Sequence, residues 1–350
     1  MNPIAIRILD WYAHHRRDLP WRNTRDPYPI WVSEVMLQQT QVDTVIPYYQ
    51  RFLLRFPTLE TLAKAPYQKV LKAWENLGYY VRARHLHEAA IKVLNEMEGE
   101  VPDSREKLMA LPGIGSYTAS AILSIAFGQR VPAVDGNVKR VMCRLFALHG
   151  PIDQKEIQDQ IYTLANDLVP AGDPGAFNQA MMELGATVCI PRRPSCHDCP
   201  VQNVCLAFLK GIQATLPVLG KKNRIPHRHM TAAIIRDGKG RLLIVQRLEN
   251  GLLGGLWKFP GGMCQPEEDP EKGLRRTMQE ELGLRISVGE RVTSVRHAYS
   301  HFRVTLHAYR CDGLRARPKA LSCREWRWVV QAHLSRFPFS KVDRQIIKAL

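Results

Sequence analysis

The sequence lacks a long hydrophobic run. None of its apolar stretches is long enough to cross a bilayer, and the first residues lack the apolar centre of a signal peptide. Low-complexity segments and internal repeats are absent as well. We therefore expect a globular protein that works in the cytoplasm and has no membrane partner.

Acidic residues are scarce relative to basic ones. The 350 residues include 33 Asp and Glu against 49 Lys and Arg, which gives a formal charge of +16. An excess of this size favours a polyanionic partner, although solubility alone also calls for charge. The length predicts two or three domains, each large enough to bury a core.

A continuous helix is excluded over residues 111–116, because Pro112, Gly113 and Gly115 interrupt it. Ser116 is suited to cap a new helix. Such a turn points unpaired backbone N–H groups and a positive helix end outward, and this arrangement can hold a phosphate without recognising a base. The alternative is a glycine-rich turn between two core helices.

Helical periodicity dominates the N-terminal half. The spacing of apolar residues predicts helices over 4–15, 31–41, 45–56, 58–65, 67–76, 81–97, 137–147 and 155–167, and another that includes Phe177. In the helix over 31–41, Glu34, Gln38 and Gln41 would share one face. Taken alone, Glu34 fits a surface carboxylate near a helix start.

Four of the eight cysteines are closely spaced, namely Cys189, Cys196, Cys199 and Cys205. Four thiols within seventeen residues indicate a bound metal rather than four packing residues. Disulfides do not suit a cytoplasmic chain. On ligand type alone, a tetrahedral zinc ion and an iron–sulfur cluster are both open.

Strand periodicity replaces helical periodicity after a basic, proline-bearing connector. The pattern predicts strands over 231–236, 241–247, 291–298, 302–310 and 325–330, and helices over 270–282 and 342–350. Asp237-Gly238 predicts a hairpin between the first two strands. We therefore divide the chain into a domain at 1–213, a linker at 214–229 and a domain at 230–350.

The string Ser-Glu-Val-Met-Leu-Gln-Gln-Thr-Gln-Val at 33–42 resembles the catalytic helix of adenine DNA glycosylases of the MutY type. The turn at 111–116, Asp135 and the cysteine spacing resemble the endonuclease III superfamily to which those enzymes belong. The resemblance implies an α-helical helix-hairpin-helix glycosylase half with two lobes and an iron–sulfur cluster loop. An α+β Nudix-like C-terminal domain would follow.

This resemblance also implies a function. The chain would be a monofunctional adenine DNA glycosylase that flips adenine out of a mispair with 8-oxoguanine or guanine and hydrolyses the N-glycosidic bond. Its partner would be double-stranded DNA with an adenine mispair. We expect a monomer in the bacterial cytoplasm, associated with the nucleoid. The four closely spaced cysteines would hold a [4Fe-4S] cluster.

Two carboxylates would carry the reaction. Glu34 resembles the general acid, which needs a raised pKa to hold its proton near neutrality. Asp135 resembles the aspartate that stabilises the positive charge on the sugar, as paired carboxylates do in glycoside cleavage. Asn137 and Tyr117 would orient water and Asp135.

Further residues are implied by the same resemblance. Those that would line the adenine pocket are Arg17, Trp21 and Gln179. Gln38 and Gln39 would enter the duplex as polar fingers, and Leu77 and Tyr79 would form the tip of a wedge. The residues that would contact the phosphate backbone are Arg82, Gly113, Gly115, Arg192 and Arg193. The loop that would recognise 8-oxoguanine is Tyr299, Ser300 and His301, with a tyrosine where a phenylalanine is expected.

Part of a Nudix metal-binding box is present, consisting of Gly262, Glu268, Arg276, Glu280, Glu281 and Gly283. Thr277 occupies a position where a glutamate is expected, which argues against diphosphate hydrolysis. Paired acids such as Glu280 and Glu281 bind hard cations in active enzymes of that kind. We prefer to interpret this pair as an exposed acidic helix end.

Lysine is absent between Leu111 and Ala126. The bifunctional pyrimidine glycosylases of the superfamily use a lysine in this hairpin to form a Schiff base, so the absence favours a monofunctional enzyme. Three alternatives are an endonuclease III-like enzyme for oxidised pyrimidines, a Nudix hydrolase of damaged nucleotides, and a non-catalytic DNA-binding scaffold.

Overall fold

The computed structural model describes residues 2–220, 225–299, 302–312 and 316–350. The described chain forms two compact units. The first unit comprises Met1–Lys64 and His85–Lys222, and the second comprises Ala65–Arg84 and Asn223–Leu350. In the part of the chain that the structure describes, no helix is long and apolar enough to cross a membrane.

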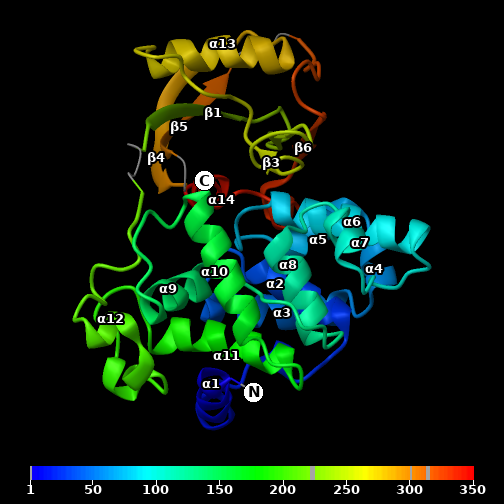
Figure 1. Ribbon diagram of the computed structural model, residues 1–350. Helices are drawn as coiled ribbons and strands as arrows, with labels where there is room; N and C mark the ends of the chain where they lie inside the picture. Colours follow the sequence, from blue (N-terminus) through cyan, green and yellow to red (C-terminus); the bar gives the residue numbers. More distant parts are fainter. Residues whose placement is uncertain (1, 221–224, 300–301, 313–315) are drawn as a thin grey trace. The chain divides into compact units, whose positions relative to one another are not determined.

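This division differs from the expected one in two places: the segment 65–84, and the expected linker at 214–229, which is divided between the two units and whose last residues already belong to the strand His227–Ile235. The sequence places 65–84 in the N-terminal domain, whereas in the structure it belongs to the second unit. The expected helices and strands are otherwise close to those observed (Figure 1).

The first unit is helical. Its helices are α1 (Pro3–His15), α2 (Pro27–Leu37), α3 (Val42–Arg55), α4 (Leu59–Ala63), most of α6 (Val81–Glu96), α7 (Arg105–Met109), α8 (Ser116–Ile125), α9 (Gly136–Leu145), α10 (Lys155–Leu168), α11 (Pro174–Thr187) and α12 (Leu206–Leu209). A buried core joins α1, α9, α10 and α11 through residues such as Ile8, Met142, Ile161 and Leu184. This core fixes the helices that carry the residues described below.

Helix α2 begins and ends four residues earlier than the expected helix over 31–41. Asp26 caps its start by accepting a hydrogen bond from the Tyr28 backbone N–H at 2.9 Å. The helix ends at Leu37, and Gln39 then adopts a positive φ of 56° in the turn before α3. Gln38 and Gln41 therefore do not continue the helical face that begins at Glu34, and this expectation is wrong.

The described residues of the second unit form two three-stranded sheets. One sheet has the order β1 (His227–Ile235), β5 (Arg303–Asp312) and β4 (Ser287–Ala298), and the other has the order β3 (Trp257–Lys258), β2 (Leu242–Gln246) and β6 (Glu325–Val329). Helix α13 (Pro270–Leu282) packs over one face of the sheet β1-β5-β4 (Figure 1). Helix α14 (Lys341–Lys348) belongs to a separate apolar cluster that includes residues of both sheets.

The hairpin expected at Asp237-Gly238 is only partly present. The turn closes, since the Asp237 backbone N–H donates to the Arg241 carbonyl at 2.9 Å. The flanking strands nevertheless enter different sheets, because β1 pairs in parallel with β5 and β2 pairs with β3 and β6. Long-range pairing therefore overrides the local turn preference.

Helix α5 (Tyr67–Ala73) joins the second unit through polar contacts. Gln68 donates to the Gly255 carbonyl at 2.9 Å and accepts from the Trp257 indole at 3.1 Å. The Glu75 carboxylate accepts from the Phe339 backbone N–H at 2.9 Å and from Arg344 Nε at 2.7 Å. The side chain of Glu75 is only 10% exposed, so these donors replace water at a largely buried charge.

We expect Glu75→Ala to lower the free energy of unfolding by about 3 kcal/mol, since it removes the carboxylate that pairs with Arg344 and leaves the Phe339 backbone N–H without its acceptor. Urea unfolding followed by tryptophan fluorescence measures the loss. The control is Arg336→Ala. Arg336 is an exposed arginine close to Arg344 in the sequence, and its substitution should change the free energy of unfolding by no more than about 0.5 kcal/mol. Equal effects of the two substitutions would contradict the role given to Glu75.

Candidate functional site

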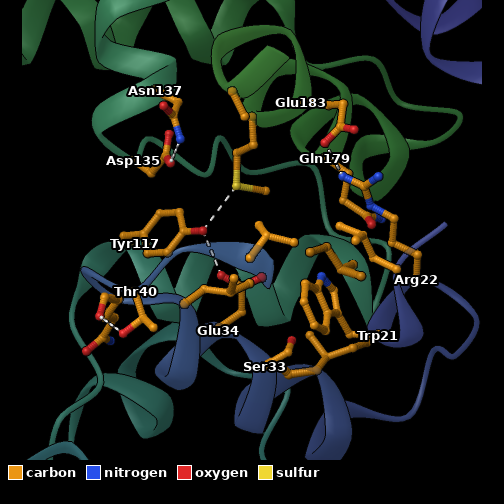
Figure 2. A pocket seen from close by; sticks show the side chains of 18 of the residues that line it. Trp21, Arg22, Ser33, Glu34, Thr40, Tyr117, Asp135, Asn137, Gln179 and Glu183 are labelled. Atoms are coloured by element: carbon orange, nitrogen blue, oxygen red, sulfur yellow. Dashed lines mark hydrogen bonds and ion pairs between the residues drawn. The ribbon is translucent and has the colours of Figure 1, made fainter. Parts of the chain in front are cut away.

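The first unit contains a cavity of about 520 Å³ that is lined from α2, α8, α9, α11 and the turn Pro20–Arg22. Figure 2 shows Glu34, Tyr117 and Asp135 on one side of it and Trp21 and Glu183 on the other. The two acids expected to act together thus border one cavity, although they are 101 residues apart in the sequence (135 minus 34). Asn137, Arg17 and Gln179, which were expected at the site, also line the cavity.

Glu34 is a buried acid with a raised pKa. The residue is 4% exposed, and burial raises the pKa of its carboxyl to about 7. The Tyr117 hydroxyl opposes this shift by donating a hydrogen bond to Glu34 Oε2 at 2.6 Å, and the charge of Asp135 adds to it. Glu34 can therefore hold a proton near neutrality. It is not the surface carboxylate near a helix start that the sequence alone permits, because it is buried and lies in the last turns of α2.

Asp135 has more hydrogen-bond donors than Glu34. It is the N-cap of α9, and its Oδ1 accepts from the Val138 backbone N–H at 2.7 Å. Its Oδ2 accepts from Asn137 Nδ2 at 2.9 Å. Burial raises the pKa of Asp135, while these donors and the charge of Arg140 oppose the rise. The environment of Asp135 therefore favours the ionised form more than that of Glu34 does.

Tyr117 contacts a different acid from the one expected. The sequence interpretation has it orient Asp135 and water, but its hydroxyl donates to Glu34 and also approaches the sulfur of Met182 at 3.1 Å. Burial and the nearby Glu34 raise the pKa of Tyr117 well above its usual value, so the phenol stays protonated. Asn137 does contact Asp135, as expected.

An ion-pair cluster at the opposite side of the cavity was not expected from the sequence. Glu183 is fully buried and accepts from Arg17 Nε at 2.8 Å and from Arg22 Nη2 at 2.7 Å. Burial raises the pKa of Glu183, but the hydrogen bonds from the two arginines outweigh it and hold the pKa at about 2. The one available signal was the spacing of Gln179 and Glu183, which are four residues apart on one helix.

The glycine-bearing turn before α8 is exposed at its tip. Gly113 has a φ of +76°, and an added Cβ there would lie 2.6 Å from the Cβ of His85, so only glycine fits. The helix is capped by Gly115 rather than by Ser116, which is already helical and accepts a hydrogen bond from Arg105. The N-terminus of this helix is exposed, and the binding of a phosphate there stays a prediction.

The expected wedge belongs to the second unit. Tyr79 is 37% exposed and has a positive φ of 46°, whereas Leu77 is only 6% exposed and cannot form the tip in this conformation. Arg82 is 7% exposed and packs over the rings of Trp74 and Tyr79, so it does not face solvent as a phosphate ligand would. Burial lowers the pKa of Arg82 to about 10.

The two glutamines expected to enter the duplex both line the cavity. Gln38 also donates to the Thr118 hydroxyl at 3.3 Å, and Gln39 is exposed.

The four closely spaced cysteines are free thiols and partly buried. Arg144, which is 2% exposed, donates to Cys189 Sγ at 3.3 Å and to the carbonyls of Ile190 and Pro191 at 2.8 and 3.0 Å. Arg192 and Arg193, in the loop between the first two cysteines, are exposed. Over the described ranges, no three His, Cys, Asp or Glu side chains are arranged to hold a single metal ion.

Protein cations neutralise the acids of the Nudix box. Glu281 is 7% exposed and pairs with Lys258 at 2.7 Å, so interpreting it as part of an exposed helix end is wrong. Arg276 pairs with Glu268 at 2.7 Å and with the exposed Glu280 at 3.0 Å. Thr277 is buried, and its hydroxyl donates to the Leu274 carbonyl at 3.2 Å.

Of the loop expected to recognise 8-oxoguanine, only one residue is described. Tyr299 is half-buried, its ring centroid is 4.8 Å from that of Phe302, and burial raises its pKa to about 12. Ser300 and His301 lie outside the described residues.

Comparisons with known proteins agree with this two-part composition. Residues 32–166 match the family of HhH-GPD superfamily base excision DNA repair proteins, and residues 231–349 match the NUDIX domain. The chain is 39% identical to the adenine DNA glycosylase of Mus musculus over 86% of this chain and 69% of that protein. It is 33% identical to the adenine DNA glycosylase of Buchnera aphidicola over 84% of this chain and 82% of that protein.

One solved structure also resembles the helical part. A thermostable thymine-DNA glycosylase is 35% identical, with a TM-score of 0.55, and the match covers 59% of this chain and 95% of that one. The expected helical glycosylase fold is thereby confirmed.

The buried Glu34 makes stability depend on pH. Its pKa rises from 4.5 in the unfolded chain to about 7 in the native state, so the native state binds more protons between these values. Stability should therefore fall as the pH rises from 4.5 to 7. Glu34→Gln removes this loss, and its stability relative to the unmodified protein should grow by on the order of 3 kcal/mol over that range.

Urea unfolding at pH 5, 6, 7 and 8 measures the difference. The control Glu106→Gln removes an exposed carboxylate from α7 and should show no such trend. A constant difference between Glu34→Gln and the unmodified protein would contradict the raised pKa.

Proposed function

The chain belongs to the adenine DNA glycosylase family, and from this premise we propose that it removes adenine mispaired with 8-oxoguanine or guanine, with Glu34 and Asp135 as its catalytic acids. Members of this family are DNA-repair hydrolases, and the match to full-length relatives extends over most of the chain. The observation that supports the assignment of the two acids is that they border one cavity but have different hydrogen-bond environments.

The reaction separates adenine from its sugar. Extrusion of the nucleotide costs a few kcal/mol and brings the base into the cavity. Glu34 donates its proton to a ring nitrogen, so that the electron pair of the breaking N-glycosidic bond moves to a neutral leaving base. Water then supplies the hydroxyl that bonds to the sugar C1′, and its proton leaves to solvent or to a carboxylate.

Tyr117 and Asn137 act through the two acids. The hydroxyl of Tyr117 occupies Glu34 Oε2, which leaves Oε1 as the oxygen that carries the acid proton. Asn137 fixes the carboxylate of Asp135, which stabilises the positive charge that develops on the sugar. Both are positioning residues in this proposal.

Trp21 and Gln179 suit the recognition of the extruded base. Trp21 lies on the side of the cavity opposite Tyr117 (Figure 2), and an indole surface can cover a purine ring. The amide of Gln179 can both donate and accept hydrogen bonds at an adenine edge. Glu183, on the same helix as Gln179, holds Arg17 and Arg22 in place through two ion pairs.

We assign a [4Fe-4S] cluster to Cys189, Cys196, Cys199 and Cys205. Four free thiols fit the donor set of such a cluster. Their spacing along the chain resembles that of the cluster ligands in the endonuclease III superfamily. When bound, the cluster would anchor the loop that presents Arg192 and Arg193, while Arg144 already supports the backbone of that loop.

The partner in this proposal is duplex DNA bound by a monomer, and such a substrate places the enzyme at the nucleoid in the cytoplasm. The positive charge and the exposed turn at Gly113 favour binding to the phosphate backbone. The loop that begins at Tyr299 is assigned to the base opposite adenine.

Release of adenine tests the proposal. We expect release from duplexes with 8-oxoguanine or guanine opposite adenine, and slow release with cytosine in that position. Glu34→Gln should lower the single-turnover rate by about 10²–10⁴-fold, because it removes the general acid. Asp135→Asn keeps an N-cap residue at the start of α9, so the loss of rate that we expect from it reports the missing charge.

The rate of adenine release should decline as the pH rises above about 7, where Glu34 loses its proton. Two results would count against the proposal. One is a rate that neither Glu34→Gln nor Asp135→Asn lowers. The other is an efficient covalent adduct after borohydride treatment, which would contradict a monofunctional hydrolase.

Hydrolysis of damaged nucleotides by the Nudix part is not expected. Lys258 and Arg276 already neutralise the acids that would hold magnesium in an active Nudix enzyme. Incubation with 8-oxo-dGTP and magnesium should therefore release no pyrophosphate or phosphate above the background of a sample without enzyme. Turnover that Glu281→Gln abolishes would show this expectation to be wrong.

A further inference from the structure

One face of the sheet β1-β5-β4 carries a basic groove that has no role so far. The polar side chains of this face that line the groove are His227, His229, Arg296, Arg303, Thr305 and His307, and the neighbouring His297 lines it as well. They come from all three strands, and the strand register places them beside one another on neighbouring strands. His227 is opposite Arg303, while His229 and Arg296 are both opposite Thr305.

The groove lies where the helix no longer covers the sheet. Side chains at alternate positions share a face of a strand, and farther along the same face Ala233, Ile235, Tyr309 and Cys311 are buried against α13. His227 and His229, at the start of β1, are instead exposed. The hollow has a volume of about 1080 Å³.

Its imidazoles are held in a defined arrangement. The rings of His229 and His307 are stacked with centroids 5.7 Å apart, and His229 Nδ1 lies 3.4 Å from His307 Nε2. The Ser294 hydroxyl lies 2.9 Å from His307 Nδ1, and Thr305 Oγ1 lies 2.9 Å from His227 Nε2. These contacts order the floor of the groove before any ligand arrives.

The charge of the groove selects an anion. Two exposed arginines, Arg296 and Arg303, border it, and no carboxylate occurs among the described residues that line it. A metal cation would be repelled by both guanidinium groups, and the described chain offers no set of three ligands for one. A phosphate diester fits the guanidinium and imidazole donors.

The position of the groove in the chain indicates which anion it meets. Ala298 at the end of β4 and Arg303 at the start of β5 both belong to it, and they flank the loop to which we assign recognition of 8-oxoguanine. We propose that the groove binds the DNA phosphate backbone beside the modified base, with Arg296 and Arg303 as the principal contacts. The location beside the modified base rests on the proposed function.

Binding of DNA as a function of salt tests the groove. The probe is a duplex with 8-oxoguanine opposite a tetrahydrofuran abasic analogue, which the enzyme cannot cleave, and fluorescence anisotropy gives the Kd at several salt concentrations. We expect Arg296→Ala and Arg303→Ala each to weaken binding several-fold and to reduce the slope of log affinity against log salt by about 1. Arg296→Lys should retain most of the slope, because it keeps the charge.

The control is Arg310→Ala. Arg310 is an exposed arginine of the same strand β5, but it pairs with Glu290 and lies outside the groove. It should leave the slope as in the unmodified protein. Since Arg296 and Arg303 are exposed, their substitutions should fold normally, and thermal unfolding verifies this.

An unchanged slope for both groove substitutions, or an equal loss for Arg310→Ala, would overturn the proposal. A groove that binds only inorganic phosphate or free nucleotide would likewise leave the slope for the duplex unchanged, and this outcome would overturn the proposal too. Failure of the proposed function is separate, since it would appear as no adenine release by the unmodified enzyme even where the groove substitutions still weaken binding.

Discussion

The site depends on keeping one carboxyl group away from water. Glu34 is 4% exposed, and Tyr117, whose hydroxyl donates a hydrogen bond to it, lies in helix α8 directly after the glycine-bearing turn. Ionised, this carboxyl would need several donors to replace its hydration, and Tyr117 supplies one strong hydrogen bond. Asp135 receives a backbone N–H and an amide instead. Burial raises the pKa of both acids, and the larger number of donors at Asp135 opposes this rise more than the single hydroxyl does at Glu34.

Helix α9 connects this cavity to the cysteine loop. Asp135 caps the helix, and Asn137 in its first turn accepts a hydrogen bond from Arg140 at 2.9 Å. Arg140 also donates to the carbonyls of Gly185 and Cys189 at 2.7 and 2.8 Å.

Close packing holds the same region in place. A Cβ on Gly185 would lie 2.6 Å from the Cβ of Asn137, so a larger residue there would push Asn137 from its place. Arg144, two turns after Asn137, supports the loop after Cys189. The cysteine loop and the carboxylate of Asp135 are therefore positioned by one short helix.

Part of this could be predicted from the sequence. Family resemblance predicts Glu34 and Asp135 at one site, and the sequence pattern predicts helix α13. What could not be predicted are pairs that only folding brings together. Glu183 meets Arg17 from 166 residues away, and Lys258 meets Glu281 from 23 residues away. Neither pair leaves a periodic pattern, because an ion pair depends on the approach of two elements and not on the repeat of either.

The grouping of 65–84 with the second unit follows from the same kind of contact. The polar side chains Gln68 and Glu75 find their partners near Trp257 and Phe339, and the turn that carries Tyr79 therefore belongs to the second unit. Within that unit, a cavity of about 540 Å³ is lined by both Tyr79 and Tyr299.

In the proposed function, the wedge and the loop that recognises 8-oxoguanine therefore belong to one compact unit, while both catalytic acids belong to the other. Recognition of the modified base and cleavage of adenine then fall to different units, and both must engage the same duplex before Glu34 can meet its base. A duplex that lacks the modified base loses contacts with the second unit only, so its adenine meets an unaltered pair of acids in the first unit. Discrimination between partners of adenine would accordingly act on how often the base reaches the cavity, and less on the rate of bond cleavage once it is there.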